Sequence, residues 1–340
     1  MSHSSSTVPE HGVQSTPGDD HDNEPQGSRR DTKKSGSNVK GGPAQDKAFA
    51  SVTVIAGAII LVVLAAVAFF LTWQASPVFG ASASQITGGK GFGAYIWPLV
   101  VGTLIASAIA LLLATPVGIG VALYISHYAP PRLAKAVGYV IDLLAAIPSV
   151  IFGAWGASVL APKIVPFYDW LSEVFGFLPI FEGPATATGK TILTAGIVLA
   201  IMILPIITAM CREIFAQTPV LQQEAALGLG ATKWEMVRMT VFPFARAGII
   251  SSIMLALGRA MGETMAVTLV LSGGPFNPSL IQSGNQTVAS EIALNFPEAY
   301  GLRLNELIAA GLVLFAITLV VNLLARLVVS RYKNFSGANS

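Results

Sequence analysis

Residues 218–246 read TPVLQQEAALGLGATKWEMVRMTVFPFAR and form a charged, helix-prone insert between two long apolar stretches. The Thr218–Pro219 pair predicts the start of one helix, because proline is tolerated at a first helical position, where its missing N–H is not needed. Two glycines, Gly228 and Gly230, predict its end. Short helices of this kind are marginally stable alone in water, so docking onto a partner would stabilise one.

Thr232 and Glu235 have the spacing of a capping box, in which the side chain of each residue hydrogen-bonds to the backbone of the other. They predict a second helix, which Pro243 ends or kinks. Two charged helices between apolar stretches indicate a surface that contacts a soluble partner. An amphipathic loop without a partner is the alternative.

The composition is that of an integral membrane protein. Of 340 residues, 53% are hydrophobic and 11% are charged, and the mean hydropathy is +0.66. The formal net charge of +2 provides no basic surface for nucleic acid. Cys211 is the single cysteine, which excludes an intrachain disulfide and a thiolate metal cluster. No pair of histidines has ligand spacing within an apolar stretch, so no metal site is predicted.

Six apolar stretches are long enough to cross a bilayer, for which about twenty residues suffice. They lie at 48–73, 95–126, 136–161, 190–211, 247–271 and 306–330. The predicted fold is therefore all-α, with six transmembrane helices in residues 48–332. Pro116 is a predicted kink in the second stretch. Ile147-Pro148-Ser149 predicts a break in the third, which would free backbone groups near a cavity.

The two ends of the chain are polar. Residues 1–47 contain almost no large apolar side chain and are predicted to form a disordered cytoplasmic tail. This tail lacks the short apolar core and cleavage site of a signal peptide. Residues 333–340 form a short C-terminal tail.

Lysine and arginine predict the orientation, because they accumulate in cytoplasmic loops. The predicted inner side carries Arg29, Arg30, Lys33, Lys34, Lys40, Lys47, Arg132, Lys135, Arg212, Lys233, Arg238, Arg246, Arg326, Arg331 and Lys333. The outer side carries Lys90, Lys163, Lys190 and Arg303. Both termini and the loop with Glu224 are thus predicted in the cytoplasm. Loops 162–189 and 272–305 face outward and are expected to form short interfacial or re-entrant helices.

Arg259 lies twelve residues after Ala247, or about 18 Å along a helix, and so near the predicted centre of the bilayer. Glu263 follows one turn later on the same face. An arginine at this depth costs about 2.5–3.5 kcal/mol, so it should face protein or a wet cavity. We expect Arg259 to offer its N–H donors to an oxyanion in transit, with Glu263 holding the guanidinium and keeping the empty pathway near neutral. A structural ion pair between helices is the alternative.

Other polar residues in the apolar stretches are weaker candidates. Thr103, Ser107 and Ser149 could add hydroxyl groups to a polar pathway, although each could equally satisfy a local backbone carbonyl. Asp142 lies near the cytoplasmic start of the third stretch, where water or a basic neighbour is its expected partner.

Two segments imitate parts of ATPases. Leu271-Ser272-Gly273-Gly274 matches four residues of a signature with which ATPase subunits contact ATP. Residues 183–191 resemble a P-loop, but five residues separate its two glycines where the motif has four. Both fall on the predicted outer side, without the strand–loop–helix setting that directs N–H groups at phosphates. The chain is therefore expected to have no catalytic residues and no ATP site of its own.

The insert resembles the EAA loop of ABC importer permeases. Glu224-Ala225-Ala226, Gly230 and Pro243 fall on the family spacing, whereas Thr240 and Phe242 stand where the pattern has Ile and Leu. Residues 143–153 and 258–264 resemble the phosphate-specific transport (Pst) permeases. The Arg-Ala-Met-Gly-Glu-Thr-Met sequence from Arg259 resembles the PstC-like members. The resemblance covers about residues 48–332.

This resemblance implies a six-span, MetI-like permease of the type I ABC importer fold in the cell inner (plasma) membrane, with a core of about 95–330. It implies a second, PstA-like permease, two PstB-like ATPase subunits that bind ATP and magnesium, and an extracytoplasmic PstS-like phosphate-binding protein. No cofactor would be bound by this chain. The loop 212–246 would couple to the ATPase through Glu224, Ala225, Ala226, Gly230 and Pro243. The embedded arginine and glutamate would be critical for phosphate transport by alternating access.

Three other functions stay open. The substrate could be sulfate, molybdate or another oxyanion. The chain could be a channel or secondary transporter that works without an ATPase. It could also be a scaffold that reports phosphate status to a membrane kinase.

Overall fold

The computed structural model describes residues 43–333 of the chain. The disordered tail predicted for 1–47 and the C-terminal tail predicted for 333–340 therefore lie almost entirely outside the described residues. Helix α1 already begins at Pro43, before the predicted start of the membrane domain. The chain divides into two units between Ala58 and Ile59, and each unit is described by itself.

The described residues are almost entirely helical. The α-helices are α1 Pro43–Gly80, α2 Phe92–Leu123, α3 Pro131–Ala145, α4 Ser149–Trp155, α5 Ala161–Phe175, α6 Ile192–Ala216, α7 Val220–Gly228, α8 Lys233–Met236, α9 Phe242–Met261, α10 Met265–Val270, α11 Val288–Asn295 and α12 Leu302–Lys333. No β-strand occurs in residues 43–333, where an isolated bridge joins Gly273 and Gly284.

Six helical segments are long and apolar enough to cross a membrane, which confirms the predicted number. They are Lys47–Gly80, Phe92–Tyr128, Ser149–Phe175, Ile192–Ala216, Lys233–Met261 and Leu302–Leu327. Four of them overlap the predicted stretches for most of their length. The third and the fifth differ.

The third crossing begins at Ser149, so the predicted span 136–161 is wrong. Helix α3 ends at Ala145 and α4 begins at Ser149, which confirms the predicted break at Pro148. Proline disfavours a helical conformation in the residue before it, so one helix stops there and another starts. The apolar stretch 136–161 thus belongs to two elements. One is the amphipathic α3, and the other continues from α4 through a π-helical turn into α5.

The fifth crossing begins at Lys233 and its helix α9 ends at Met261, whereas the prediction was one helix over 247–271. A π-helical turn, Val237–Val241, joins α8 to α9. Pro243 therefore falls in the first turn of α9, where its missing N–H matters least. The helix does not end at Pro243; the irregularity is the π turn directly before it.

The core is built around α6, which is the most buried of the six spans. Helix α2 packs against it with a stripe of small residues at intervals of four, namely Ala106, Ala110, Ala114, Gly118 and Ala122. Small side chains let two backbones approach closely, and van der Waals packing then holds the helices together within a membrane. The approach is close enough that a Cβ on Gly118 would lie 2.9 Å from the side chain of Ile207.

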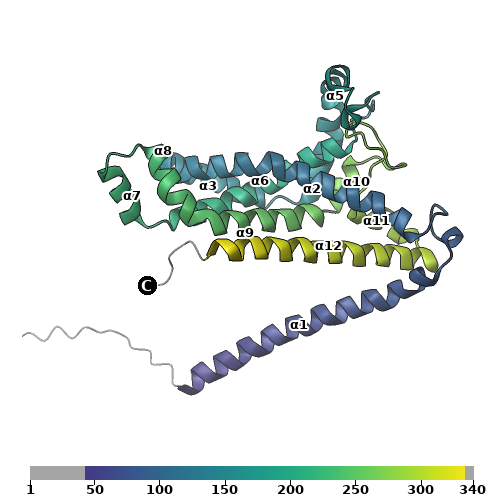
Figure 1. The fold of residues 1–340 in the computed structure, drawn as a ribbon, viewed down its shortest axis with the longest axis horizontal. Helices are drawn as coiled ribbons and strands as arrows, with labels where there is room; N and C mark the ends of the chain where they lie inside the picture. Colours follow the sequence, from purple (N-terminus) through teal and green to yellow (C-terminus); the bar gives the residue numbers. More distant parts are fainter. Residues whose placement is uncertain (1–42, 334–340) are drawn as a thin grey trace, which may run out of the picture. The chain divides into compact units, whose positions relative to one another are not determined.

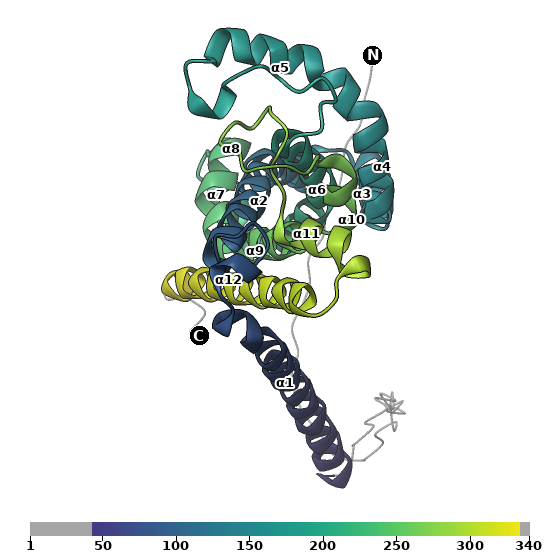
Figure 2. The ribbon, with the colours of Figure 1, turned by 90° about the vertical axis from the view of Figure 1, so that its right-hand side faces the viewer.

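The unit from Ile59 onward places its connecting segments at two opposite ends of this bundle. Helices α2, α6 and α9 lie side by side, and α12 runs along α9 (Figures 1 and 2). Helices α7 and α8 lie at one end, while α5, α10 and α11 lie at the other (Figure 1). Short helices were expected in both long loops, 162–189 and 272–305, and α11 confirms the expectation for the second loop. Helix α5 falls in the first loop but belongs to the third membrane crossing, Ser149–Phe175.

Candidate functional site

A cavity of about 1100 Å³ lies along α9 and α12. Helix α9 lines it with residues spaced three or four apart, which places them on one face of the helix, and α12 contributes three residues from its last turns. The lining includes Ala247, Ser251, Gly258, Arg259, Gly262, Glu263, Asn322, Ala325 and Arg326. A Cβ on Gly258 would meet no atom within 4 Å, so the missing side chain leaves this space open.

Arg259 lies in the last turn of α9 and opens into this cavity. Its Nη2 lies 4.0 Å from the Sδ of Met202, a weak acceptor. The carbonyl groups that end α9 favour a cation at this position. Among the described residues, no carboxylate forms an ion pair with Arg259. The cavity therefore contains a positive charge that is available to an anion.

Glu263 also lines the cavity, but it lies beyond the end of α9. Only 7% of it is exposed, and its Oε1 accepts the backbone N–H of Ala266 at 3.2 Å, in the first turn of α10. The prediction of one continuous helix with Arg259 and Glu263 on the same face is wrong. Gly262 favours the break, because glycine in a helix interior is destabilising. The carboxylate caps α10 instead of holding the guanidinium.

Thr103 and Ser107 are buried in α2 and do not line this cavity. Their hydroxyl groups donate to the carbonyls of Leu99 and Thr103, both at 2.7 Å. Thr103 Oγ1 also accepts the backbone N–H of Val288 at 3.0 Å, which ties α2 to α11. The local interpretation of the two hydroxyl groups is confirmed. Ser149 is the first residue of α4 and lines neither this cavity nor the smaller one described below, so its place in a pathway stays a prediction.

Helix α12 brings two polar side chains to the cavity that sequence reasoning did not place there. Asn322 and Arg326 lie one turn apart and both line it. Arg326 was counted only as a charge that sets the orientation. A signal was present, because a polar pair at positions i and i+4 in an apolar span shares one helix face.

Helix α7 carries most of the predicted coupling residues. Pro219 is the N-cap residue of this helix, whereas the prediction placed it at the first helical position. Gly230 follows the end of the helix with a φ of +87°. The N–H groups of Gly230 and Ala231 donate to the carbonyls of Leu227 and Ala226 at 3.0 and 3.2 Å, which is a Schellman motif. A left-handed conformation costs a residue with a side chain about 1–2 kcal/mol, so this position favours glycine.

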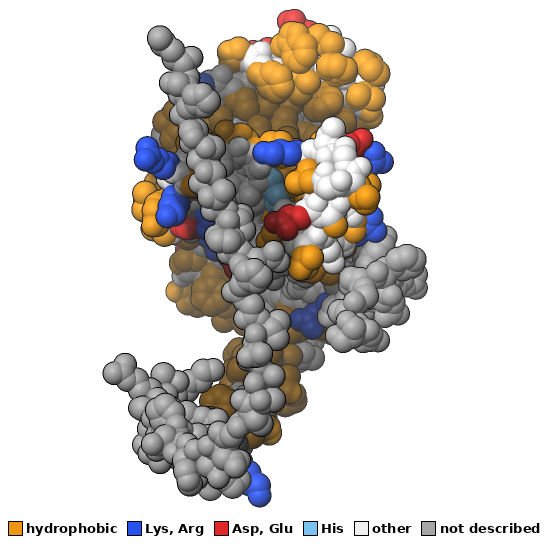
Figure 3. All heavy atoms as spheres, turned by 90° about the vertical axis from the view of Figure 1, so that its left-hand side faces the viewer, with side chains coloured by type: hydrophobic (Ala, Val, Ile, Leu, Met, Phe, Trp, Pro, Cys, Tyr) orange, Lys and Arg blue, Asp and Glu red, His pale blue; other side chains and the backbone are white. Residues whose placement is uncertain are grey.

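The face around α7 combines exposed charge with exposed apolar side chains (Figure 3). Glu224 and Ala225 point to solvent, whereas Ala226 packs into the core. Leu221 and Leu229 are 81% and 90% exposed. The predicted capping box that starts α8 is confirmed, because the Glu235 N–H donates to Thr232 Oγ1 at 3.3 Å and the Thr232 N–H donates to Glu235 Oε2 at 2.8 Å. This exposed, partly apolar surface is suited to contact another protein.

Behind α7 lies a smaller cavity of about 500 Å³, between α3, the end of α6 and the start of α7. Arg212 and Asp142 lie on its wall and form an ion pair at 3.3 Å. The expectation that Asp142 meets a basic neighbour is confirmed. Gly138 lets the two helices approach, because a Cβ there would meet Nη1 of Arg212.

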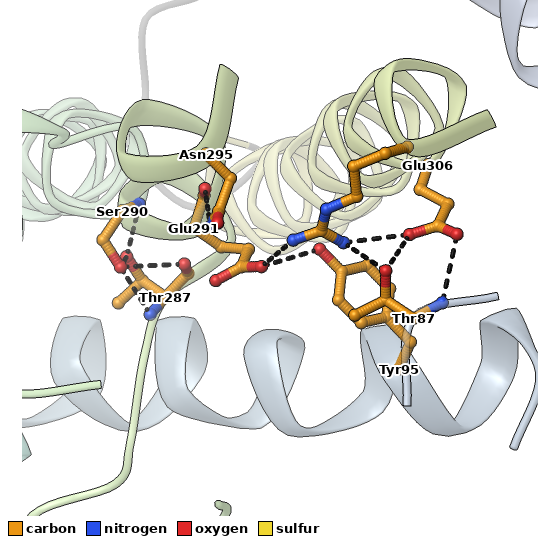
Figure 4. A network of polar contacts seen from close by, with 8 residues as sticks. Thr87, Tyr95, Thr287, Ser290, Glu291, Asn295 and Glu306 are labelled. Atoms are coloured by element: carbon orange, nitrogen blue, oxygen red, sulfur yellow. Dashed lines mark hydrogen bonds and ion pairs between the residues drawn. The ribbon is translucent and has the colours of Figure 1, made fainter. Parts of the chain in front are cut away.

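A partly buried ionic network at the opposite end of the bundle was not predicted from the sequence (Figure 4). Arg303 donates to Glu291 Oε1 at 2.7 Å and to Glu306 Oε2 at 2.9 Å. The Tyr95 hydroxyl donates to Glu291 Oε1 at 3.0 Å, and the Thr87 N–H donates to Glu306 Oε1 at 3.1 Å. The network joins the α1–α2 loop and α2 to α11 and α12, and so fixes this end of the molecule.

The chain is similar in sequence to known membrane proteins. A family model described as binding-protein-dependent transport system inner membrane component matches residues 114–334. The chain is 44% identical over 284 residues to phosphate transport system permease protein PstC 2 of Mycobacterium tuberculosis, covering 80% of this chain and 87% of that one. It is 47% identical over 253 residues to PstC of Mycobacterium leprae, covering 73% and 79%. A solved structure of the inward-facing MetNI methionine ABC transporter matches at 16% identity with a TM-score of 0.49, covering 70% of this chain and 94% of that one.

Proposed function

The chain belongs to the family of binding-protein-dependent transport system inner membrane components, and on this premise we propose that it is a PstC-type permease that forms a phosphate pathway together with a second, PstA-like permease. It is a multi-pass membrane protein of an ABC importer. The observation that carries the assignment of the pathway is Arg259, whose guanidinium lines a cavity of about 1100 Å³ and pairs with no carboxylate of residues 43–333.

The energy comes from two PstB-like ATPase subunits, which hold ATP and magnesium, and this chain performs no bond chemistry. The ATPase docks on α7, where exposed Glu224 and Ala225 lie beside exposed leucines. Ala226 packs α7 against the core, and the Schellman turn at Gly230 sets the direction in which the chain leaves α7 toward α8, so a movement of the ATPase is transmitted to the spans. Pro243 follows the π turn that joins α8 to α9 and so lies on the same connection.

The end of the bundle that carries α7 faces the cytoplasm, together with both termini. The distribution of lysine and arginine along the sequence supports this orientation. A PstS-like phosphate-binding protein then docks at the opposite end, where α5 and α11 lie (Figure 1). ATP-driven closure of the ATPase pair opens the permease pair toward the loaded binding protein, and hydrolysis returns it to the inward-facing state.

Phosphate passes the Arg259 guanidinium, whose planar set of N–H donors matches a tetrahedral oxyanion. Glu263 is close enough to share the cavity but is engaged by the backbone of α10. Its negative charge limits the strength with which an anion is held, and so allows release.

The test is uptake of labelled phosphate and labelled sulfate by proteoliposomes that contain this chain with its partner permease, the ATPase subunits and the binding protein. We expect phosphate uptake that depends on ATP and on the ATPase subunits. Sulfate or molybdate uptake at an equal rate would assign another oxyanion. Uptake that persists without the ATPase would make the chain a channel or a secondary transporter.

A further inference from the structure

Arg259 is not the only cation on the cavity wall. Arg326 lines it from the last turn of the sixth span, and Asn322 lines it one turn before. In the described part of the chain, no ion pair or hydrogen bond engages the side chain of Arg326. Two arginines therefore share one cavity, and no carboxylate of the described segment is bound to either, an arrangement that an anion would stabilise.

The two cations lie toward different ends of the cavity. Helix α12 runs antiparallel to α9, so its last turns lie near the first turns of α9, on the side of α7 (Figure 1). The α9 wall extends from Ala247 to Gly262, which is about 22 Å at the rise of a helix. Arg259 lies near the far end of this wall, whereas Arg326 lies near the end at α7.

We infer that Asn322 and Arg326 form a second phosphate-binding position at the α7 end of the cavity. This inference rests on the proposed function, in which phosphate passes Arg259. An anion that leaves Arg259 is received by the Arg326 guanidinium and the Asn322 amide before it enters the cytoplasm. Two weaker positions in series allow an anion to move on, where one strong position would hold it.

The chemistry of Asn322 adds selectivity. Its side chain has an N–H₂ donor and a carbonyl acceptor. Phosphate at neutral pH carries at least one O–H group, which can donate to the Asn322 carbonyl while its other oxygens accept from Arg326. Sulfate is fully deprotonated and has no such donor. The pair therefore favours phosphate over sulfate at the exit.

The first experiment compares maximal phosphate uptake by the complete transporter with Arg326→Gln and with Arg132→Gln. Arg132 is an exposed cation in α3 that lines neither cavity, so it controls for the loss of one positive charge. We expect Arg326→Gln to lower uptake about tenfold, the effect of losing one hydrogen bond to a charged group, and Arg132→Gln to change it less than twofold. Arg326→Lys, which retains the charge, should recover part of the rate. Equal rates for the two glutamine variants would overturn the inference.

The second experiment separates phosphate from a lipid headgroup as the partner of Arg326. A cysteine replaces Ser251 on the cavity wall and reacts with a maleimide. The natural Cys211 is fully buried, so the parent protein is the background control. Inorganic phosphate should slow labelling more than sulfate at equal ionic strength, and Arg326→Gln should raise the half-protecting concentration about tenfold. If phosphate protects the Ser251→Cys protein equally well with and without Arg326→Gln, the partner of Arg326 is a lipid headgroup and the inference is overturned. Absence of phosphate uptake by the unchanged transporter would instead contradict the proposed function.

Discussion

Arg259 lies in the last turn of one helix and Glu263 caps the next, and the two side chains line the same cavity without pairing with each other. The helix of the fifth span therefore ends between two residues of opposite charge. The cation lies at the carboxyl end of α9 and the carboxylate lies at the amino end of α10, which is the arrangement that helix dipoles favour. Irregular backbone of this kind is tolerated in a membrane where it lines a cavity.

Substitutions at Glu263 should separate the effect of its negative charge from the effect of the hydrogen bond with which it caps α10. Glu263→Gln retains an acceptor for the Ala266 N–H but removes the negative charge, so phosphate is held more tightly. We expect a lower KM and a lower maximal uptake rate with an unchanged melting temperature. Glu263→Ala also removes the cap, at a cost of about 1 kcal/mol, and should lower the melting temperature as well. Equal melting temperatures for the two variants would show that the cap contributes nothing.

Gly230 and Gly228 form a matched pair for testing the end of α7. A Cβ would have open space at both positions, but only Gly230 has a positive φ. Gly230→Ala should cost about 1 kcal/mol and displace the coupling helix, whereas Gly228→Ala should be neutral or slightly stabilising. The measurement is the ratio of phosphate taken up to ATP hydrolysed, which should fall only for Gly230→Ala. If this ratio fell by the same amount in both variants, the Schellman turn would have no special role in coupling.

Glu224→Lys should uncouple the ATPase or prevent its docking, because the reversed charge lies on the exposed face of α7. Glu213→Lys makes the same change of charge on an exposed residue near the end of α6 and is the control. We expect loss of ATP-driven uptake, and loss of ATPase co-purification or unproductive hydrolysis, only for Glu224→Lys. Normal uptake with that change would refute the coupling assignment.

The partly buried network at the opposite end should contribute to stability. Glu306 is 1% exposed and accepts hydrogen bonds from Thr87 and Arg303. Removing one partner of a buried ion pair costs about 3–5 kcal/mol. Glu306→Gln should therefore lower the melting temperature of the purified permease, whereas Glu298→Gln, an exposed residue, should not. Similar melting temperatures would show that water already compensates the charges of the network.

Features encoded by local sequence could be predicted. The six spans follow from long apolar stretches, and the capping box at Thr232 and the glycine stop at Gly230 follow from residues within one turn. The break at Pro148 was also predicted, but its consequence was not. Both sides of the proline are apolar, so hydrophobicity alone could not show that the third crossing starts after it.

Features that depend on long-range packing could not be predicted. Gly262 resembles other glycines of membrane helices, and only the structure shows that α9 ends there. The contribution of Asn322 and Arg326 to the cavity depends on α12 packing along α9, residues far apart in the chain. Thr87 and Glu306 are 219 positions apart, and no sequence pattern pairs them.

The central claim is that phosphate binds the Arg259 guanidinium on its way through the membrane. The most direct test is ATP-driven uptake of labelled phosphate by the assembled transporter with Arg259→Gln, with assembly checked by co-purification of the partner subunits. Losing a charge-assisted hydrogen bond to the anion should lower uptake roughly 10- to 100-fold, while Arg259→Lys should retain part of the activity and assembly should be unchanged. Uptake at the rate of the unchanged transporter, with Arg259→Gln fully assembled, would contradict the account.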